Sequence, residues 1–197
     1  MRIAVVGSGK MGRGFAQALA GAHEVVGSRN EDRAVALAAK IGAAGGATYA
    51  GAVAGADVVI LAVPWTAMTD TLAQFDGLTG AVVIDMTFAY NKQQRADLRG
   101  RSTAEVIQSR LPEARVVKGW NHVFAVHLAA PEIDGIAASV LIAGDDRDAK
   151  EIVFTIARDM GFHPVDVGPL RAARDLETLA GTMTFIKLGP FRVLSSP

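Results

Sequence analysis

The chain has 197 residues, half of them hydrophobic, with no cysteine and with 20 basic against 20 acidic side chains, so its formal net charge is zero. This length allows one domain with at most a small appendage, and the composition excludes disulfides, thiolate chemistry and the basic footprint of a nucleic-acid-binding protein. No run approaches the ~18 apolar residues of a membrane span and no signal peptide opens the chain, so we expect a soluble cytoplasmic protein without a membrane partner.

Short apolar runs alternate with helix-like segments along the chain, and this alternation predicts strands and helices in turn. Strands are expected at 2–6, 23–27, 47–50, 56–63, 80–86, 114–120, 137–144 and 163–167. Helices are expected at 10–21, 31–42, 66–75, 103–111, 146–161 and 170–187, the last of them after Pro169. The stretch 87–102 is expected to be a polar loop.

Apolar strands that alternate with helices indicate a parallel sheet covered on both faces. The sequence therefore predicts an α/β fold, namely a Rossmann-type, doubly wound, mostly parallel sheet with a small C-terminal helical part.

A glycine pattern, G-x-G-x-x-G, lies between the first strand and the first helix at residues 7–12. Gly7 permits a tight turn, Gly9 lets the backbone approach a pyrophosphate, and Gly12 lets the helix lie against the strand. The N-terminus of the helix then offers N–H groups and a positive dipole end to the anion. We expect a dinucleotide site here, and a purely structural glycine turn is the alternative.

The end of the second strand carries Ser28 and Arg29, where many dinucleotide-binding chains have Asp or Glu. A carboxylate there binds the ribose 2′-hydroxyl of NAD and would repel a 2′-phosphate. A guanidinium can instead bind the phosphate in a bidentate manner, Ser28 can donate a further hydrogen bond, and Arg33 adds a second cation. These residues favour NADP over NAD; the alternative is a solvated helix start with two unrelated arginines.

The fourth strand ends at Ala62, Val63 and Pro64. Ligands of doubly wound sheets lie outside the carboxyl ends of the strands, so the backbone of 62–64 is expected beside the nicotinamide half of the cofactor. Trp65 either forms a wall of this pocket or simply packs in the protein.

Five segments are informative together: GSGKMGRG (7–14), VVGSRN (25–30), VPW (63–65), STAEVIQSRLPEARVVKGWNHVFA (102–125) and DVGPLRAARDLETL (166–179). They resemble the NADPH-dependent reductases of the deazaflavin coenzyme F420, a domain that also serves as the cytoplasmic NADPH-binding part of membrane ferric reductases. The resemblance extends from Met1 to about Gly189.

The resemblance implies hydride transfer between NADP and F420 in a cleft between an NADP-binding domain, 1–144, and a C-terminal strand-helix extension, 145–197. Positions carried over to the NADP side are Ser8, Lys10, Met11, Ser28, Arg29, Arg33, Ala62, Val63 and Pro64. The hydride face maps to Asn121, which takes the catalytic role, and to Val123. Arg174 and Thr178 of the last helix are expected to contact the second cofactor.

Three positions depart from the family pattern. Archaeal members tend to have GGTG in the turn where this chain has GSG. They have His at position 121, whereas the ferric-reductase branch and many bacterial relatives share the Asn, and Ala180 replaces an expected Thr or Ser. The NADP half of the site is therefore better supported than the identity of the hydride acceptor.

Hydride transfer between two bound rings requires positioning more than acid–base groups. His122, His127 and His163 are candidates for proton transfer, although lone histidines are more often packing residues, and we assign no metal. Arg171 and Arg174 either meet an anionic acceptor or form a solvated face. The apolar side of the last helix, with Leu176, Leu179, Met183 and 185–188, predicts self-association into a homodimer.

Three functions remain open at this point. The first is an NADPH:F420 oxidoreductase. The second is an NADPH-dependent reductase of another acceptor, such as a free flavin, a ferric chelate or an imine. The third is a non-catalytic NADPH-binding sensor.

Overall fold

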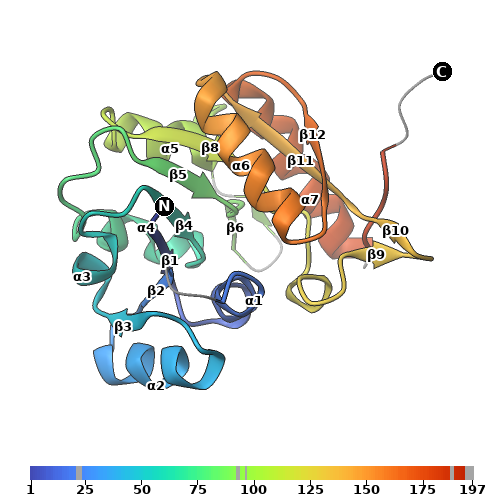
Figure 1. The fold of residues 1–197 in the computed structure, drawn as a ribbon. Helices are drawn as coiled ribbons and strands as arrows, with labels where there is room; N and C mark the ends of the chain where they lie inside the picture. The colour runs from blue at the N-terminus through green and yellow to red at the C-terminus, as the bar shows by residue number, and fades with distance from the viewer. Residues whose placement is uncertain (21–23, 92–93, 96, 187–188, 194–197) are drawn as a thin grey trace.

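An eight-stranded sheet with helices on both faces forms the centre of the molecule (Figure 1). The computed structural model describes residues 1–20, 24–91, 94–95, 97–186 and 189–193. The strands of the sheet are β1 (Ile3–Val6), β2 (Glu24–Gly27), β3 (Gly45–Ala47), β4 (Val58–Leu61), β5 (Val82–Asp85), β8 (Arg115–Lys118), β11 (Ser139–Gly144) and β12 (His163–Asp166). The α-helices are α1 (Lys10–Ala18), α2 (Glu31–Ile41), α3 (Tyr49–Val53), α4 (Trp65–Leu72), α5 (Thr103–Arg110), α6 (Arg147–Asp159) and α7 (Ala173–Ile186).

The two faces of the sheet are covered by different helices, because successive strand residues point to opposite sides. In β1, Ile3 and Val5 pack in a cluster with α1, α2 and α6, whereas Ala4 and Val6 pack in a second cluster with α3, α4 and α5. Both faces are therefore apolar, which explains the continuous hydrophobic runs in the sequence.

The strand order is β12-β11-β8-β5-β4-β1-β2-β3, and the strands from β8 to β3 are parallel. This topology confirms the predicted Rossmann-type, mostly parallel sheet. β11 runs antiparallel to β8 and is joined to it by only two residue pairs, Ala143 with Lys118 and Gly144 with Val117. β12, from the predicted C-terminal part, pairs with β11 in parallel through four residue pairs.

The third strand was predicted at 47–50, but it lies at Gly45–Ala47 and is followed directly by α3. The reason is a helix cap: the Thr48 side chain accepts a hydrogen bond from Gly51 N at 3.2 Å, so Tyr49 is already helical. The second strand was predicted from 23; it is found from Glu24, and position 23 lies outside the described residues.

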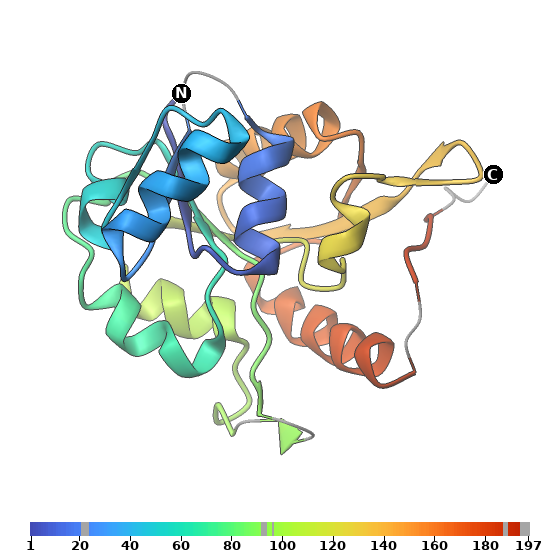
Figure 2. The ribbon, with the colours of Figure 1, turned by 90° about the horizontal axis from the view of Figure 1, so that it is seen from below.

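Two short hairpins extend away from the body of the protein (Figure 2). The first, β6 (Tyr90–Asn91) with β7 (Gln94–Arg95), lies in the stretch predicted as a loop. The second, β9 (Glu132–Ile133) with β10 (Ile136–Ala137), follows the 3-10 turn η1 (Ala125–His127). Asp134 and Gly135 form its turn with φ of 50° and 75°. An Asp-Gly pair between short apolar runs is a hairpin signal, so this element was predictable.

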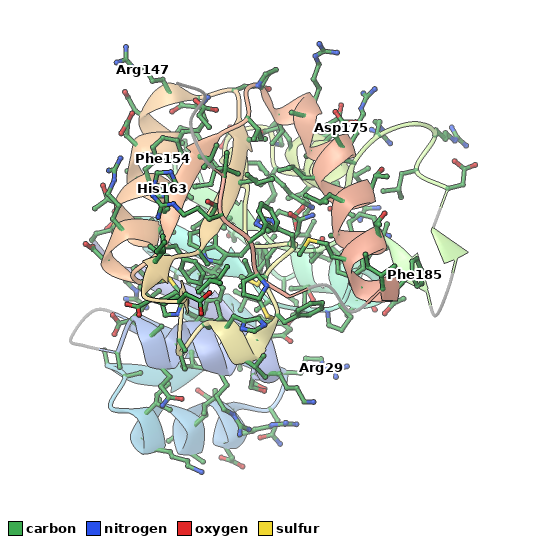
Figure 3. All side chains as sticks on the ribbon, turned by 90° about the vertical axis from the view of Figure 1, so that its right-hand side faces the viewer. Arg29, Arg147, Phe154, His163, Asp175 and Phe185 are labelled. Carbon is green, nitrogen blue, oxygen red and sulfur yellow. The ribbon has the colours of Figure 1, made fainter. Side chains whose placement is uncertain are left out.

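The last helix is preceded by a separate 3-10 turn, η2 (Leu170–Ala172), which begins after Pro169. Leu176 and Met183 of α7 are buried within the protein, whereas Phe185 and Ile186 are 51% and 64% exposed near its end (Figure 3). Positions 187–188 of the predicted self-association face lie outside the described residues. The homodimer stays a prediction.

Candidate functional site

The glycine turn connects β1 to α1, and each of its glycines has a separate reason. Gly7 has φ of 124°, and a Cβ on it would lie 2.5 Å from the Ala62 carbonyl oxygen. A Cβ on Gly12 would lie 1.7 Å from the Gly7 carbonyl oxygen. A Cβ on Gly9 would meet no protein atom within 4 Å. Gly7 and Gly12 are therefore required by the fold, whereas Gly9 borders open space.

This open space lies at the start of α1. No side chain caps the helix there, and the first-turn N–H groups of a helix have no partner within it. Those donors and the positive end of the helix suit an anion such as a pyrophosphate. The backbone at the start of α1 therefore agrees with the predicted cofactor-binding positions Ser8, Lys10 and Met11.

A cavity of about 450 Å³ lies beside the turn, at the carboxyl ends of β1, β2 and β4. Its lining residues are Gly7, Ser8, Gly9, Ser28, Arg29, Asn30, Arg33, Tyr49, Ala62, Val63 and Pro64. The structure thus brings the predicted cations Arg29 and Arg33 to one cavity, together with Ser28. None of these lining residues is acidic, so the cavity is suited to a phosphate.

Local hydrogen bonds hold the polar residues of this cavity in place. The hydroxyl oxygens of Ser8 and Ser28 lie 3.3 Å apart, and Asn30 N donates to the Ser28 hydroxyl at 3.3 Å. The Asn30 side chain caps α2 by accepting from Arg33 N at 2.9 Å. Arg29 is exposed and extends outward from the ribbon (Figure 3).

Tyr49 is a cavity residue that the sequence did not single out. It is the first residue of α3 and is 6% exposed. Burial raises the pKa of its phenol, while the charge of Arg29 and a hydrogen bond with Arg29 act in the opposite direction. Tyr49 therefore contacts the guanidinium that was predicted to bind a phosphate, and both side chains contribute to the same wall.

A second cavity, of about 380 Å³, continues from the turn to the carboxyl ends of β4 and β5. It is lined by Gly9, Lys10, Met11, Ala62, Val63, Pro64, Trp65, Met86, Thr87 and Phe88. Trp65 is part of the cavity wall, which agrees with the first of its two interpretations, a wall of the nicotinamide pocket. Residues 86–88 were missed, although they follow a strand of the same sheet, and the rule for carboxyl ends could have located them.

Asn121 and Val123 are not among the lining residues of these two cavities. Val123 is buried in the core, and Asn121, 6% exposed, donates from its Nδ2 to the Leu176 carbonyl oxygen at 2.9 Å. The amide of Asn121 thus tethers α7. Its predicted role at the hydride face stays a prediction.

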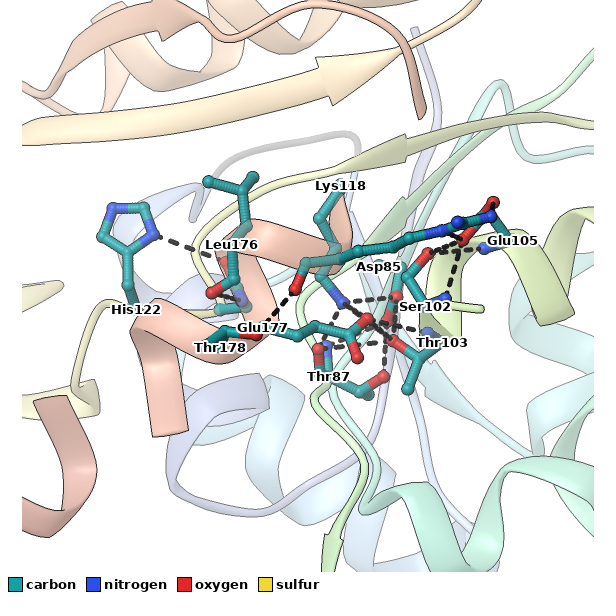
Figure 4. Close-up of polar contacts among 12 residues, drawn as sticks. Asp85, Thr87, Ser102, Thr103, Glu105, Lys118, His122, Leu176, Glu177 and Thr178 are labelled. Carbon is teal, nitrogen blue, oxygen red and sulfur yellow. Dashed lines mark hydrogen bonds and ion pairs between the residues drawn. The ribbon is translucent and has the colours of Figure 1, made fainter. Parts of the chain in front are cut away.

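Arg174 and Thr178 line a third depression with Asp97, Leu98, Gly100, Arg101 and Asp175. Arg174 donates from Nε and Nη2 to the two carboxylate oxygens of Glu105, at 2.9 and 2.6 Å (Figure 4). Partial burial alone would raise the pKa of Glu105, but the hydrogen bonds from Arg174 and Ser102 lower it to about 2. Arg174 therefore joins α7 to α5, and its contact with a second cofactor is untested.

His122 is buried and lies between β11 and the ring of Phe191. Its Nε2 is 3.3 Å from the Ser139 carbonyl oxygen. Burial lowers the pKa of His122 from 6.5 to about 4, although the Ser139 hydrogen bond acts in the opposite direction. The imidazole is neutral at pH 7 in the folded protein, which fits packing rather than proton transfer.

This pKa predicts how stability depends on pH. The unfolded chain binds a proton at His122 below about pH 6.5, whereas the folded chain does so only below about pH 4. The free energy of unfolding should therefore fall as the pH drops from 6.5 to 4, by about 3 kcal/mol in total. Urea unfolding at several pH values measures this slope. A His122→Gln variant should lose this contribution and show a shallower slope, and an unchanged slope in that variant would contradict the assignment.

Among the described residues, no helix combines the length and apolar character needed to cross a membrane. In the same part of the chain, no three His, Asp or Glu side chains are placed to hold a metal ion together.

Comparison with known proteins finds a family model and several similar proteins. Residues 2–89 match the family model described as NADP oxidoreductase, coenzyme F420-dependent. The F420-dependent NADP reductase of Methanothermobacter thermautotrophicus is 34% identical over an aligned length of 200 residues. The alignment covers 91% of this chain and 86% of that protein. The solved structure of a candidate F420-dependent NADP reductase from Arthrobacter sp. FB24 is 25% identical with a TM-score of 0.85, covering 99% of this chain and 100% of the other.

A metalloreductase is also among the similar proteins. The metalloreductase STEAP3 of Rattus norvegicus is 34% identical over 181 residues, or 90% of this chain. The present chain spans only 36% of the length of that protein.

Proposed function

Because the chain belongs to the family of coenzyme F420-dependent NADP oxidoreductases, we propose that it transfers a hydride between NADP(H) and F420. It is an NADP-dependent oxidoreductase, and the observation that supports NADP is the cavity with Ser28, Arg29 and Arg33 but no acidic lining residue. A 2′-phosphate there would be bound by charge-assisted hydrogen bonds from the two guanidinium groups.

The remaining parts of the dinucleotide follow from the two joined cavities. The start of α1, with Ser8, Lys10 and Met11, would hold the pyrophosphate. The nicotinamide would lie in the second cavity against the backbone of 62–64 and beside residues 86–88. When bound, the nicotinamide supplies or accepts the hydride. The chain contributes position and exclusion of water, which supply most of what hydride transfer requires.

The acceptor side is assigned to the neighbourhood of α7. Arg174 and Thr178 would contact the acceptor, and Asn121 would act by holding α7 at Leu176. These residues would hold the acceptor within reach of the nicotinamide, and a hydride from NADPH together with a proton from solvent would complete the reduction of F420.

A second candidate function has a different acceptor for the same hydride. The similarity to the metalloreductase over 90% of this chain favours a flavin or a ferric chelate. An imine acceptor and a non-catalytic NADPH sensor are the remaining alternatives.

Stopped-flow oxidation of NADPH separates these functions. We expect rapid loss of NADPH absorbance with F420, and slow or no loss with FMN, ferric citrate or a cyclic imine at the same concentration. Clear reaction with FMN or ferric citrate but not with F420 would replace the first function by the second. Tight NADPH binding without oxidation by any acceptor would leave the sensor function.

A further inference from the structure

Tyr49 lies on the wall of the cavity of about 450 Å³ and has no role in the function proposed above. Its side chain is buried and belongs to the apolar cluster that also contains Ala52 and Val53 of α3. The same residue lines the cavity together with Ser28 and Arg29. A phenol is thus fixed at the boundary between the core and the proposed phosphate site.

The place of Tyr49 follows from the pairing of β2 with β3. Ala47, the last residue of β3, pairs with Gly27, and its carbonyl oxygen accepts a hydrogen bond from Ser28 N at 3.1 Å. Tyr49 comes two residues later, as the first residue of α3. A Cβ on Gly27 would lie 3.4 Å from Tyr49 Cδ1, so the ring packs directly on the end of β2, from which the chain continues to Arg29.

The contact between Tyr49 and Arg29 has a fixed hydrogen-bond direction. Burial raises the pKa of the Tyr49 phenol, and the charge of Arg29 and its hydrogen bond only partly offset this effect. The phenol therefore keeps its proton at pH 7. A guanidinium has donors but no acceptor, so the phenol oxygen accepts from Arg29. The proton of the hydroxyl is not used in this contact and can be donated to a ligand in the cavity.

Arg29 differs from Tyr49 in how firmly it is held. Its side chain is exposed and extends outward (Figure 3), and an exposed arginine loses rotamer freedom when it binds a phosphate. The phenol belongs to a packed ring, so its hydrogen bond restricts the guanidinium before a ligand arrives. Preorganisation of this kind lowers the entropic cost of binding.

We propose that Tyr49 selects NADP(H) over NAD(H), by orienting Arg29 and by donating its own hydroxyl proton to the 2′-phosphate. The inference rests on the NADP side of the function proposed above. A phosphate accepts charge-assisted hydrogen bonds from both groups, whereas the ribose 2′-hydroxyl of NAD carries no charge and binds them more weakly. Loss of the Tyr49 hydroxyl should therefore weaken the binding of one cofactor and not of the other.

Tyr49→Phe tests this inference, because it removes the hydroxyl and keeps the packed ring. We expect the Kd for NADPH to rise about tenfold, the order of one hydrogen bond to a charged group, while the Kd for NADH does not change. Fluorescence titrations with the two reduced cofactors, without any hydride acceptor, measure both values. Calorimetry with adenosine 2′,5′-bisphosphate and with ADP repeats the comparison without a nicotinamide, and only the bisphosphate should bind more weakly to the variant.

A double-mutant cycle separates the two roles of the phenol. In an Arg29→Ala background, Tyr49→Phe should weaken NADPH binding less than it does in the wild type, since part of its effect passes through Arg29. Additive losses would overturn the orienting role. Thr155→Val removes a hydroxyl that bonds to the Glu151 carbonyl oxygen within α6; it is the matched control and should change neither Kd.

Thermal unfolding of each variant shows that the fold is kept. Equal weakening of NADPH and NADH binding in folded Tyr49→Phe, or an unchanged ratio of the two Kd values, would overturn the inference and leave the proposed function standing. Because the titrations contain no hydride acceptor, failure of the wild type to reduce F420 would overturn the proposed function without affecting the inference. Equal affinity of the wild type for NADPH and NADH would overturn the inference together with the assignment of the cavity to a 2′-phosphate.

Discussion

Replacement of Gly9 by valine is expected to abolish dinucleotide binding while the protein remains folded. Gly9 has no positive φ, and a Cβ there would meet no protein atom within 4 Å, so the fold can accept the side chain. The isopropyl group would instead occupy the space in which the pyrophosphate approaches the backbone. We expect the Kd for NADPH to rise by about two orders of magnitude or more, which corresponds to ~3 kcal/mol.

NADPH fluorescence titration measures the loss, and circular dichroism reports the fold. Gly45→Val is the matched control, because Gly45 also has open space around its Cβ position but lies in β3, away from both cavities. Retained NADPH affinity in folded Gly9→Val would show that the pyrophosphate does not bind at this turn.

Arg29→Asp is expected to narrow or reverse the preference for NADP(H) over NAD(H). The substitution removes a charge-assisted hydrogen bond to the 2′-phosphate, a contribution of roughly 1.5–3 kcal/mol, and it places a carboxylate where it repels the phosphate. The same carboxylate can accept hydrogen bonds from the ribose of NAD. We therefore expect the ratio of the two Kd values to shift by about tenfold to a hundredfold.

Parallel titrations of wild type and variant with NADPH and NADH measure this ratio. Arg147→Asp makes the same change of charge at an exposed position at the start of α6, and it should leave the ratio unaffected. Equal affinity of the wild type for the two cofactors would remove the basis of the prediction.

The sheet and the phosphate side of the site were predictable because their determinants are local. Six consecutive residues specify the turn from β1 into α1, and Ser28 and Arg29 follow β2 directly. The central strands can be recognised from the sequence as continuous apolar runs, and the structure buries all residues of these runs in β1 and β4. The weak third strand was misplaced because a single capping residue, Thr48, begins a short helix that has little hydrophobic periodicity.

The buried ion pairs that join β5, β8 and α7 were less predictable, because their residues come from distant parts of the chain. Asp85, Lys118 and Glu177 meet only after β5, β8 and α7 have packed. In the sequence, Lys118 is a charged residue at the end of an apolar run, and Glu177 follows two other charged residues, Arg174 and Asp175, in the same predicted helix. Neither position shows locally that its side chain is buried. The hydrogen bond from the Asn121 side chain to the Leu176 carbonyl oxygen likewise forms only when α7 has packed against this part of the chain.

The short ladder between β8 and β11 has a mechanical consequence. A sheet resists bending at each seam in proportion to the hydrogen-bonded length there, and this seam has two residue pairs where most of its neighbours have four. The backbone ladder of the eight-stranded sheet is thus shortest between these strands. Lys118 belongs to the seam and also binds Glu177, so the stiffness of the joint depends on a buried ion pair as well as on backbone.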